Sequence, residues 1–240
     1  MAVNLPIPTV NNGLVQSKPV LLVVGHSWIR RLRENWHNLP HPTILSKFTL
    51  VFVHTSTIKN CLEAQVLLGF QHIKPSLILF LFGANDLARF PRCDVANWYL
   101  ELLKITYFLF PRVKIIVSTV ENRFPPHSQE KPGAQLLEFQ RESRSFNSWL
   151  ARGSQRRFDA LFLLRGQHLL TDRSLYVKDG VHLTWEGEAK LLVMLARFLA
   201  KTRRCGDVPI GLTHLMTFCG HPERCRNCWD FTPRWKKQKH

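Results

Sequence analysis

The chain has 240 residues, of which 45% are hydrophobic and 21% are charged. This balance is typical of a folded domain with a real core and excludes a wholly disordered chain, and no apolar run approaches the roughly 18 residues of a membrane span. The formal net charge of +16 favours polyanions and anionic surfaces as partners, although a basic surface without a dedicated partner is the simpler interpretation.

The cysteines and the amino end indicate a reducing compartment. The first residues have neither the basic nor the apolar segment of a secretory signal. Without such a signal, the six cysteines are expected to be free thiols or metal ligands rather than a disulfide framework. We expect an intracellular protein, cytoplasmic or nuclear, that is monomeric.

Residues 1–18 predict a flexible lead-in, and regular alternation begins at Pro19. We expect strands at 20–24, 47–54, 77–82, 113–120 and 159–164, and helices at 28–36, 58–69, 95–110, 135–151 and 184–201. Gly69 is expected to end the second helix, Pro111 the third, and Thr184 to cap the last. Strands that alternate with helices predict an α/β fold with a parallel sheet covered on both sides, in one domain over residues 19–202.

Three polar clusters lie where such a fold places a site. They are Gly25-His-Ser-Trp28, Gly83-Ala-Asn-Asp86 and Asp179-Gly-Val-His182. The first two follow strands, and ligand sites in parallel sheets lie beyond the carboxyl ends of the strands. Each cluster alone is explained better by a turn, a polar loop or a helix cap. All three in this order are far more specific.

The residue types in these clusters suit acyl transfer. A serine at a strand-to-helix turn, Ser27, presents its hydroxyl above the sheet edge, next to its own N–H and the helix dipole. Asn85 offers an amide donor for an oxyanion, and Gly83 permits close backbone approach. The spacing of Asp179 and His182 lets the carboxylate orient the imidazole and support its protonated form.

With these clusters the chain resembles the SGNH hydrolases, the superfamily of GDSL-like esterases and lipases, over about residues 20–200. The resemblance implies a three-layer αβα sandwich of the flavodoxin-like type with a five-stranded parallel sheet. It implies Ser27 as the nucleophile, Asp179 and His182 as the rest of the triad, and Asn85 as an oxyanion-hole donor in a Gly-x-Asn-Asp block that begins at Gly83. No cofactor is needed for this catalysis.

Two further features refine the resemblance. Asp86 occupies the last position of the Gly-x-Asn-Asp block, where we expect a structural role. Two segments are most similar to SGNH-type domains of animal proteins, some of them linked to transposable elements. They are Gly-His-Ser-Trp-Ile-Arg-Arg-Leu and, later in the chain, Phe146-Asn-Ser-Trp-Leu150.

The chain departs from the family pattern at two positions. His26 precedes the serine where the family usually has aspartate, and we expect it to stabilise the turn. The segment after the second strand, His54-Thr-Ser-Thr57, lacks the glycine whose N–H serves the oxyanion hole. The N–H of Thr55 or Ser56 substitutes only if the turn needs no positive φ. One lost oxyanion donor lowers the rate by about a hundredfold to a thousandfold. Weak activity is therefore expected if neither Thr55 nor Ser56 supplies the N–H.

Residues 203–240 form a separate, basic tail with eight basic and three acidic side chains. Cys219, His221, Cys225 and Cys228 have spacing that suits a tetrahedral zinc site, although reduced thiols are the simpler interpretation. The tail also interleaves aromatic residues with arginine and lysine, as in proteins that bind single-stranded RNA or DNA, although a solvated basic tail is the simpler interpretation.

Two functions follow from these residues. The first is a serine esterase that cleaves carboxylic esters of small-molecule or lipid-like substrates through Ser27. The alternative is a catalytically weak or inactive SGNH-fold interaction module that binds nucleic acid or protein through its basic surface and tail. The complete set of Ser27, Asn85, Asp179 and His182 favours the first, and the missing glycine favours the second.

Removal of the tail tests its predicted role. The full-length protein is expected to bind single-stranded RNA more tightly than a chain that ends at Lys201, with a steeper loss of affinity as salt rises, because phosphate contacts release counterions. Titrations of both proteins at two salt concentrations check this, and equal affinities and slopes would exclude the tail as the binding element. Metal analysis of the same pair tests the zinc site, which predicts about one equivalent in the full-length protein only.

Overall fold

The structure is a computed structural model that describes residues 18–129, 131–153, 161–164 and 170–204. The predicted lead-in at 1–18 and the predicted tail at 203–240 lie outside this range, except for Lys18, Arg203 and Arg204.

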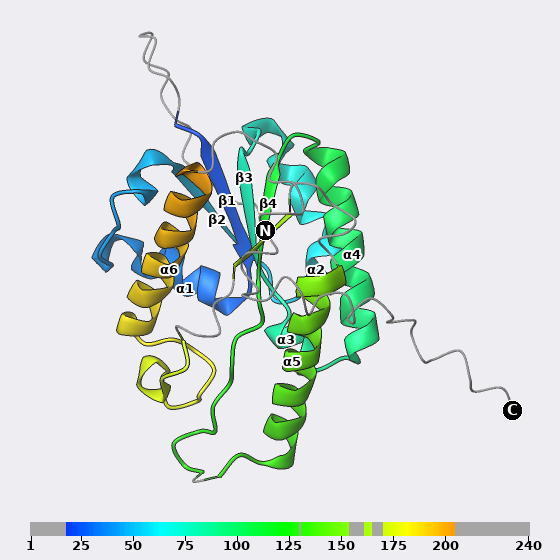
Figure 1. Cartoon of the computed structure of the whole chain (residues 1–240), viewed down its shortest axis with the longest axis vertical. Helices are drawn as coiled ribbons and strands as arrows, with labels where there is room; N and C mark the ends of the chain where they lie inside the picture. Colours follow the sequence, from blue (N-terminus) through cyan, green and yellow to red (C-terminus); the bar gives the residue numbers. More distant parts are fainter. Residues whose placement is uncertain (1–17, 130, 154–160, 165–169, 205–240) are drawn as a thin grey trace, which may run out of the picture.

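The sheet has five parallel strands in the order β2-β1-β3-β4-β5 (Figure 1). They are β1 (Val20–Gly25), β2 (Thr49–His54), β3 (Leu77–Leu81), β4 (Lys114–Ser118) and β5 (Leu161–Leu164). Each overlaps a strand predicted from the sequence, so the predicted fold class is confirmed. The strand order reverses between β1 and β3, and such a switch point opens a crevice at the carboxyl ends of the strands.

Helices cover both faces of this sheet and give three layers (Figure 1). The α-helices are α1 (Ser27–Asn35), α2 (Ile58–Glu63), α3 (Ala84–Leu87), α4 (Arg92–Leu109), α5 (Ala134–Gly153) and α6 (Trp185–Arg204), and the short 3₁₀ helices are η1 (Trp36–Asn38), η2 (Leu45–Lys47), η3 (Val66–Ile73) and η5 (Arg173–Leu175). Helices α1 and α6 pack on one face, and α2, α4 and α5 on the other.

The central strand β1 is buried on both sides, as its continuous apolar run predicts. Leu22 and Val24 join the core beneath α4 and α5, whereas Leu21 and Val23 join the core beneath α1 and α6. Side chains alternate between the faces of a strand, so an uninterrupted apolar run serves two cores at once.

The prediction of one helix over residues 58–69 is wrong. Helix α2 ends at Glu63, Gln65 adopts a left-handed conformation with φ of 47°, and η3 then begins at Val66. Gly69 does not end a helix, because η3 continues to Ile73. The apolar residues whose spacing suggested one helix are buried on both sides of this break, since Ile58 and Leu67 lie in the same core.

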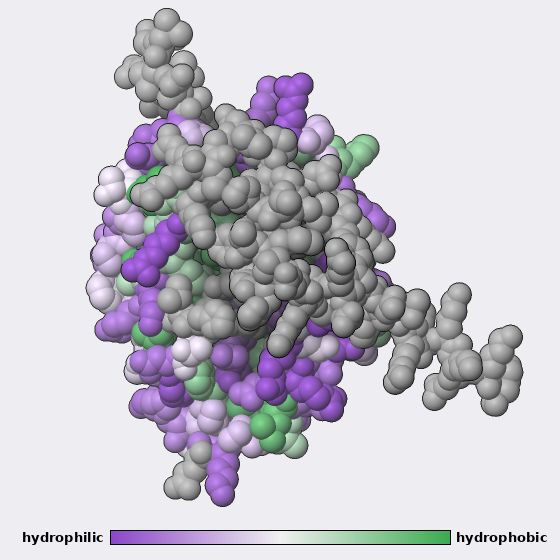
Figure 2. Space-filling view, viewed as in Figure 1, coloured by the Kyte–Doolittle hydropathy of each residue, from purple (hydrophilic) through white to green (hydrophobic). Residues whose placement is uncertain are grey.

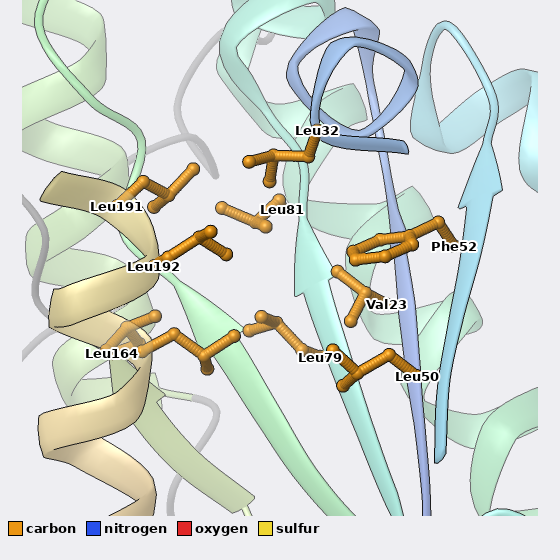
Figure 3. A pocket seen from close by; sticks show the side chains of 10 residues that line it. Val23, Leu32, Leu50, Phe52, Leu79, Leu81, Leu164, Leu191 and Leu192 are labelled. Carbon is orange, nitrogen blue, oxygen red and sulfur yellow. The ribbon is translucent and has the colours of Figure 1, made fainter. Parts of the chain in front are cut away.

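The core beneath α1 and α6 leaves a cavity of about 10 Å³ (Figure 3). Its lining is entirely aliphatic or aromatic: Val23, Leu32, Leu50, Phe52, Leu79, Leu81, Leu164, Leu191, Leu192 and Leu195. A space of this size holds at most one water, and no polar group lines it to bind one. It is therefore a packing gap and not a ligand site.

The described surface is mainly hydrophilic on the face shown in Figure 2, with apolar residues in scattered groups. The large apolar side chains that are exposed come from η3, α4, α5 and α6: Leu68, Phe108, Leu137, Trp185 and Val193. In the part of the chain that the structure describes, no helix is long and apolar enough to cross a membrane.

A buried acid follows β4. The Glu121 carboxyl lies 2.6 Å from the Ser118 hydroxyl and is only 4% exposed. Burial raises the pKa of Glu121 to about 7, although the Ser118 hydroxyl and the backbone N–H of Glu121 favour the charged form. At neutral pH this group is therefore close to half protonated.

Glu121 is expected to make stability depend on pH. Its folded pKa lies above the ordinary value of 4.5, so the unfolded chain loses this proton first as pH rises. Because of this group, the free energy of unfolding of the wild type should fall by about 3 kcal/mol in total as pH rises from 4.5 to 7. The isosteric Glu121→Gln does not titrate, so its stability relative to wild type should increase across this window. Urea unfolding at about pH 5 and about pH 8 measures the difference, and parallel stability curves for the two proteins would contradict it.

Candidate active site

Ser27 is the first residue of α1, directly beyond the carboxyl end of β1. The turn into the helix is tight, because a Cβ on Gly25 would lie 2.5 Å from the carbonyl oxygen of Leu81 on β3. Among the described residues, the N–H of Ser27 has no hydrogen-bond acceptor. It is one of the unpaired amides that begin every helix, and it is available to a ligand at the sheet edge.

The structure brings Ser27, His182 and Asp179 together. The Nε2 atom of His182 lies 3.0 Å from the Ser27 hydroxyl oxygen, and Nδ1 of the same ring lies 2.6 Å from Oδ2 of Asp179. Both separations are hydrogen-bond distances. The serine and the histidine are 155 positions apart in the sequence, and the fold brings them together.

The Asp179 carboxylate is held ionised. Its Oδ1 atom accepts hydrogen bonds from the N–H groups of Val181, at 2.8 Å, and His182, at 3.0 Å. Burial opposes ionisation, but the His182 side chain and these two amides outweigh burial and hold the pKa of Asp179 below its ordinary value. A carboxylate can only accept, so Nδ1 of His182 carries the ring proton and Nε2 is free to accept the proton of Ser27.

The loop that carries His182 is fixed by neighbouring backbone. Trp28 donates its indole N–H to the carbonyl of Val181 at 3.0 Å, which ties this loop to the residue after the serine. Gly180 has φ of 72°, and a Cβ there would meet the carbonyl oxygen of Phe124 at 2.1 Å. Phe124 donates its N–H to the carbonyl of Gly180 at 2.9 Å. Only glycine fits this contact.

A buried carboxylate joins the helices that follow the serine and the histidine. Glu188 on α6 is 1% exposed and accepts from Arg31 Nε at 3.1 Å and from Asn35 Nδ2 at 2.8 Å, both on α1. Thr184 caps α6, as predicted, because its hydroxyl accepts from the N–H of Gly187. Nothing in the local sequence pattern of α6 indicates this contact of Glu188 with α1, because its partners lie more than 150 positions away in the chain.

The amide of Asn85 is oriented from both ends. Its Nδ2 donates to the carbonyl of Ser56 at 3.0 Å, and its Oδ1 accepts from Nη2 of Arg123 at 2.9 Å. Gly83, with φ of 106°, makes the turn that leads to Asn85, and a Cβ on Gly83 would meet Val120 at 2.6 Å. Sequence analysis missed Arg123, because a single arginine in the long segment after β4 carries no motif.

The turn after β2 forms without the glycine of the family pattern. Neither Thr55 nor Ser56 has a positive φ, so the turn needs no glycine. The N–H of Thr55 is used in a hydrogen bond to the carbonyl of Gly25 at 2.9 Å. Within the described residues the N–H of Ser56 has no acceptor, which leaves Ser56, rather than Thr55, free to donate to a ligand.

His26 stabilises the turn before Ser27. It is the N-cap of α1, and its Nδ1 accepts from the N–H of Trp28 at 3.5 Å. Burial, with the positive charge of Arg123 as the next cause, lowers the pKa of His26 to about 3. The imidazole is therefore neutral at physiological pH, which leaves its Nδ1 lone pair to cap the helix.

Asp86 has the structural contacts that its position in the motif implies. The side chain is 1% exposed, and Oδ1 accepts from the N–H of Ile58, the first residue of α2, at 2.9 Å. Burial raises the pKa of Asp86 to about 6, against backbone hydrogen bonds led by that of Ile58. This contact joins the turn after β3 to the helix after β2.

The predicted zinc ligands Cys219, His221, Cys225 and Cys228 lie outside the described residues. Within the described part of the chain, no group of three or more His, Cys, Asp and Glu side chains is arranged to hold a metal ion. The two cysteines described there, Cys61 and Cys93, are free thiols, and burial raises the pKa of Cys61 to about 12.

No family model and no curated protein matches this chain. Solved structures are similar to it. A carbohydrate esterase family 3 protein from Talaromyces cellulolyticus has a TM-score of 0.54 and 14% identity, with 77% of this chain and 97% of that chain covered. An acetyl esterase mutant with acetate ion has a TM-score of 0.56 and 15% identity, with 76% and 97% covered.

A GDSL-like lipase from Bacteroides thetaiotaomicron has a TM-score of 0.52 and 15% identity, with 78% of this chain and 92% of that chain covered. The fold of this chain is therefore the fold of GDSL-like lipases and acetyl esterases, as its resemblance to the SGNH hydrolases predicted. The narrower likeness to animal, transposable-element-associated domains stays a prediction.

Substitution of Asp86 tests its role in the fold. Asp86→Ala leaves the buried N–H of Ile58 without its acceptor, which should lower the free energy of unfolding by about 1–3 kcal/mol. Asp86→Asn keeps an acceptor oxygen of the same shape and should cost less. Urea unfolding of both variants measures the difference, and equal losses would show that the hydrogen bond to Ile58 is unimportant.

Proposed function

We propose that this protein is a serine hydrolase that cleaves carboxylic esters by acyl transfer through Ser27. The hydrogen-bonded series from Ser27 through His182 to Asp179 carries the proposal, because this order of groups activates a hydroxyl as a nucleophile. Ser27 lies just beyond the carboxyl end of β1, in a fold shared with esterases and lipases, and this position supports ester hydrolysis.

In the first step, His182 accepts the Ser27 proton at Nε2 while the serine oxygen bonds to the ester carbonyl carbon. The carbonyl oxygen takes the negative charge. When the tetrahedral intermediate collapses, the alcohol leaves with the proton from His182, and Ser27 holds the acyl group. Water then attacks this acyl ester and gives a proton to His182 as the base, and His182 returns this proton to the Ser27 oxygen as the acid is released. Asp179 keeps the ring oriented and stabilises its charged form throughout.

The oxyanion is stabilised by three donors in this proposal. They are the N–H of Ser27, the N–H of Ser56 and the second Nδ2 hydrogen of Asn85. The strand order places the Ser27 turn between the other two, since β1 pairs with β2 on one side and β3 on the other. Ser56 replaces the missing glycine as a backbone donor, and Gly83 contributes the conformation of the turn. Each donor contributes about a hundredfold to a thousandfold in rate.

The test of the nucleophile is Ser27→Ala. It is expected to abolish labelling by a fluorophosphonate probe and turnover of p-nitrophenyl acetate, because no oxygen remains to attack. The melting temperature should stay close to that of wild type, since alanine is favourable in the first turn of a helix. Ser46→Ala is the matched control, because among the described residues its hydroxyl bonds only to the carbonyl of Thr43 in its own exposed turn.

Labelling and turnover in Ser46→Ala should match those of wild type. Turnover retained in Ser27→Ala would contradict the assignment of the nucleophile. A folded wild-type protein that takes no probe would favour the interaction-module alternative instead.

A further inference from the structure

Arg123 places a guanidinium directly behind the Asn85 amide. One nitrogen, Nη2, donates to Oδ1 of Asn85 at 2.9 Å and to the carbonyl oxygen of Ala84 at 3.0 Å. The guanidinium carbon also lies 4.6 Å from the centre of the Phe139 ring on α5, a distance at which a cation is attracted to the ring face. The backbone of Arg123 is also held from α5, since the Gln140 side chain donates to the carbonyl of Arg123 at 3.1 Å.

These contacts fix which end of the amide faces which neighbour. Arginine can only donate, and the carbonyl of Ser56 can only accept, so Asn85 must direct its oxygen to Arg123 and its nitrogen to Ser56. One Nδ2 hydrogen is used by Ser56, and among the described residues the other has no acceptor. If the Asn85 amide turned over, its oxygen would face the Ser56 oxygen and its nitrogen would face a cation.

Arg123 forms no ion pair with an acidic side chain in the part of the chain that the structure describes. In the described ranges no carboxylate lies within ion-pair distance of it. Burial, followed by the nearby charge of Arg89, lowers the pKa of Arg123, and Asp179 opposes these effects. A guanidinium remains charged under these conditions. Its positive charge therefore acts on the Asn85 amide at hydrogen-bond distance, whereas Asp179 acts on it from beyond ion-pair distance.

We propose that Arg123 is a positioning residue for the oxyanion hole, which holds the Asn85 amide in its donating orientation and polarises it. A cation on Oδ1 draws electron density from the nitrogen, so the free Nδ2 hydrogen becomes a stronger donor to the developing oxyanion. This inference rests on the proposed function for its effect on rate. The orientation of the amide is a separate property that can be measured without any substrate.

The kinetic test compares Arg123→Met with Arg141→Met. Met keeps the apolar stem over Phe139 and removes the donors. Arg141 is an exposed arginine of α5 that pairs with the acids Glu138 and Glu142, so it serves as the matched control. With p-nitrophenyl acetate, Arg123→Met is expected to lower kcat by about 10- to 100-fold, less than complete loss of an oxyanion donor, with KM nearly unchanged. Arg141→Met should match wild type, and Arg123→Lys should recover part of the loss.

The pair with Asn85 separates positioning from other roles. If Arg123 acts through Asn85, Arg123→Met should cause little further loss of kcat in an Asn85→Ala background. An unchanged kcat in Arg123→Met would overturn the proposal. So would a rise in KM alone, which would make Arg123 a substrate-binding cation, or a full additional loss in the Asn85→Ala background.

A spectroscopic readout distinguishes failure of this inference from failure of the proposed function. The side-chain amide signals of Asn85, assigned by their loss in Asn85→Ala, are expected to shift in Arg123→Met and to stay in place in Arg141→Met. Absence of ester turnover by wild type would count against the proposed function only. Unmoved amide signals in Arg123→Met would overturn the positioning role, whatever the turnover.

Discussion

The Glu188 carboxylate joins α1, which begins with Ser27, to α6, which follows His182, and so fixes the distance between these two parts of the candidate site. It lies in the core between α1 and α6, where Arg31 and Asn35 are its partners. A buried charge that loses its partners is strongly destabilising, so α6 cannot slide along α1 without a large penalty. Because Ser27 begins α1 and His182 lies just before α6, the contact of Glu188 with α1 helps to hold Ser27 and His182 in register. The indole of Trp28 on Val181 makes the same connection closer to the chemistry.

The strands of the sheet and the three polar clusters of the site could be predicted from the sequence, since both rest on local patterns. Apolar runs such as that of β1 predict strands that are buried on both faces. The same patterns predict where strands and helices end, and the three polar clusters lie next to these ends. Parallel topology then brings the ends of β1 and β3 to one edge. The Asp179–His182 pairing also follows from short spacing, because three residues of separation suffice for contact.

Features that depend on distant contacts were not predictable. Gln65 enters the left-handed region within a segment whose apolar spacing suggested one helix, and only packing in the folded core explains the break. Arg123 comes from a stretch without any motif, and its partner Asn85 is 38 residues away. The turn at Ser56 shows a third limit: a missing family glycine does not report a missing donor, because the conformation of the turn decides whether glycine is needed.

The contact between Gly180 and Phe124 has a consequence for how this chain can vary during evolution. The segment from Phe124 to His127 pairs with the segment from Lys178 to Gly180 through two backbone hydrogen bonds, Phe124 N–H to Gly180 and His127 N–H to Lys178. An insertion or deletion inside either segment would shift this pairing and carry His182 with it. Length changes are therefore expected to accumulate before or after these segments.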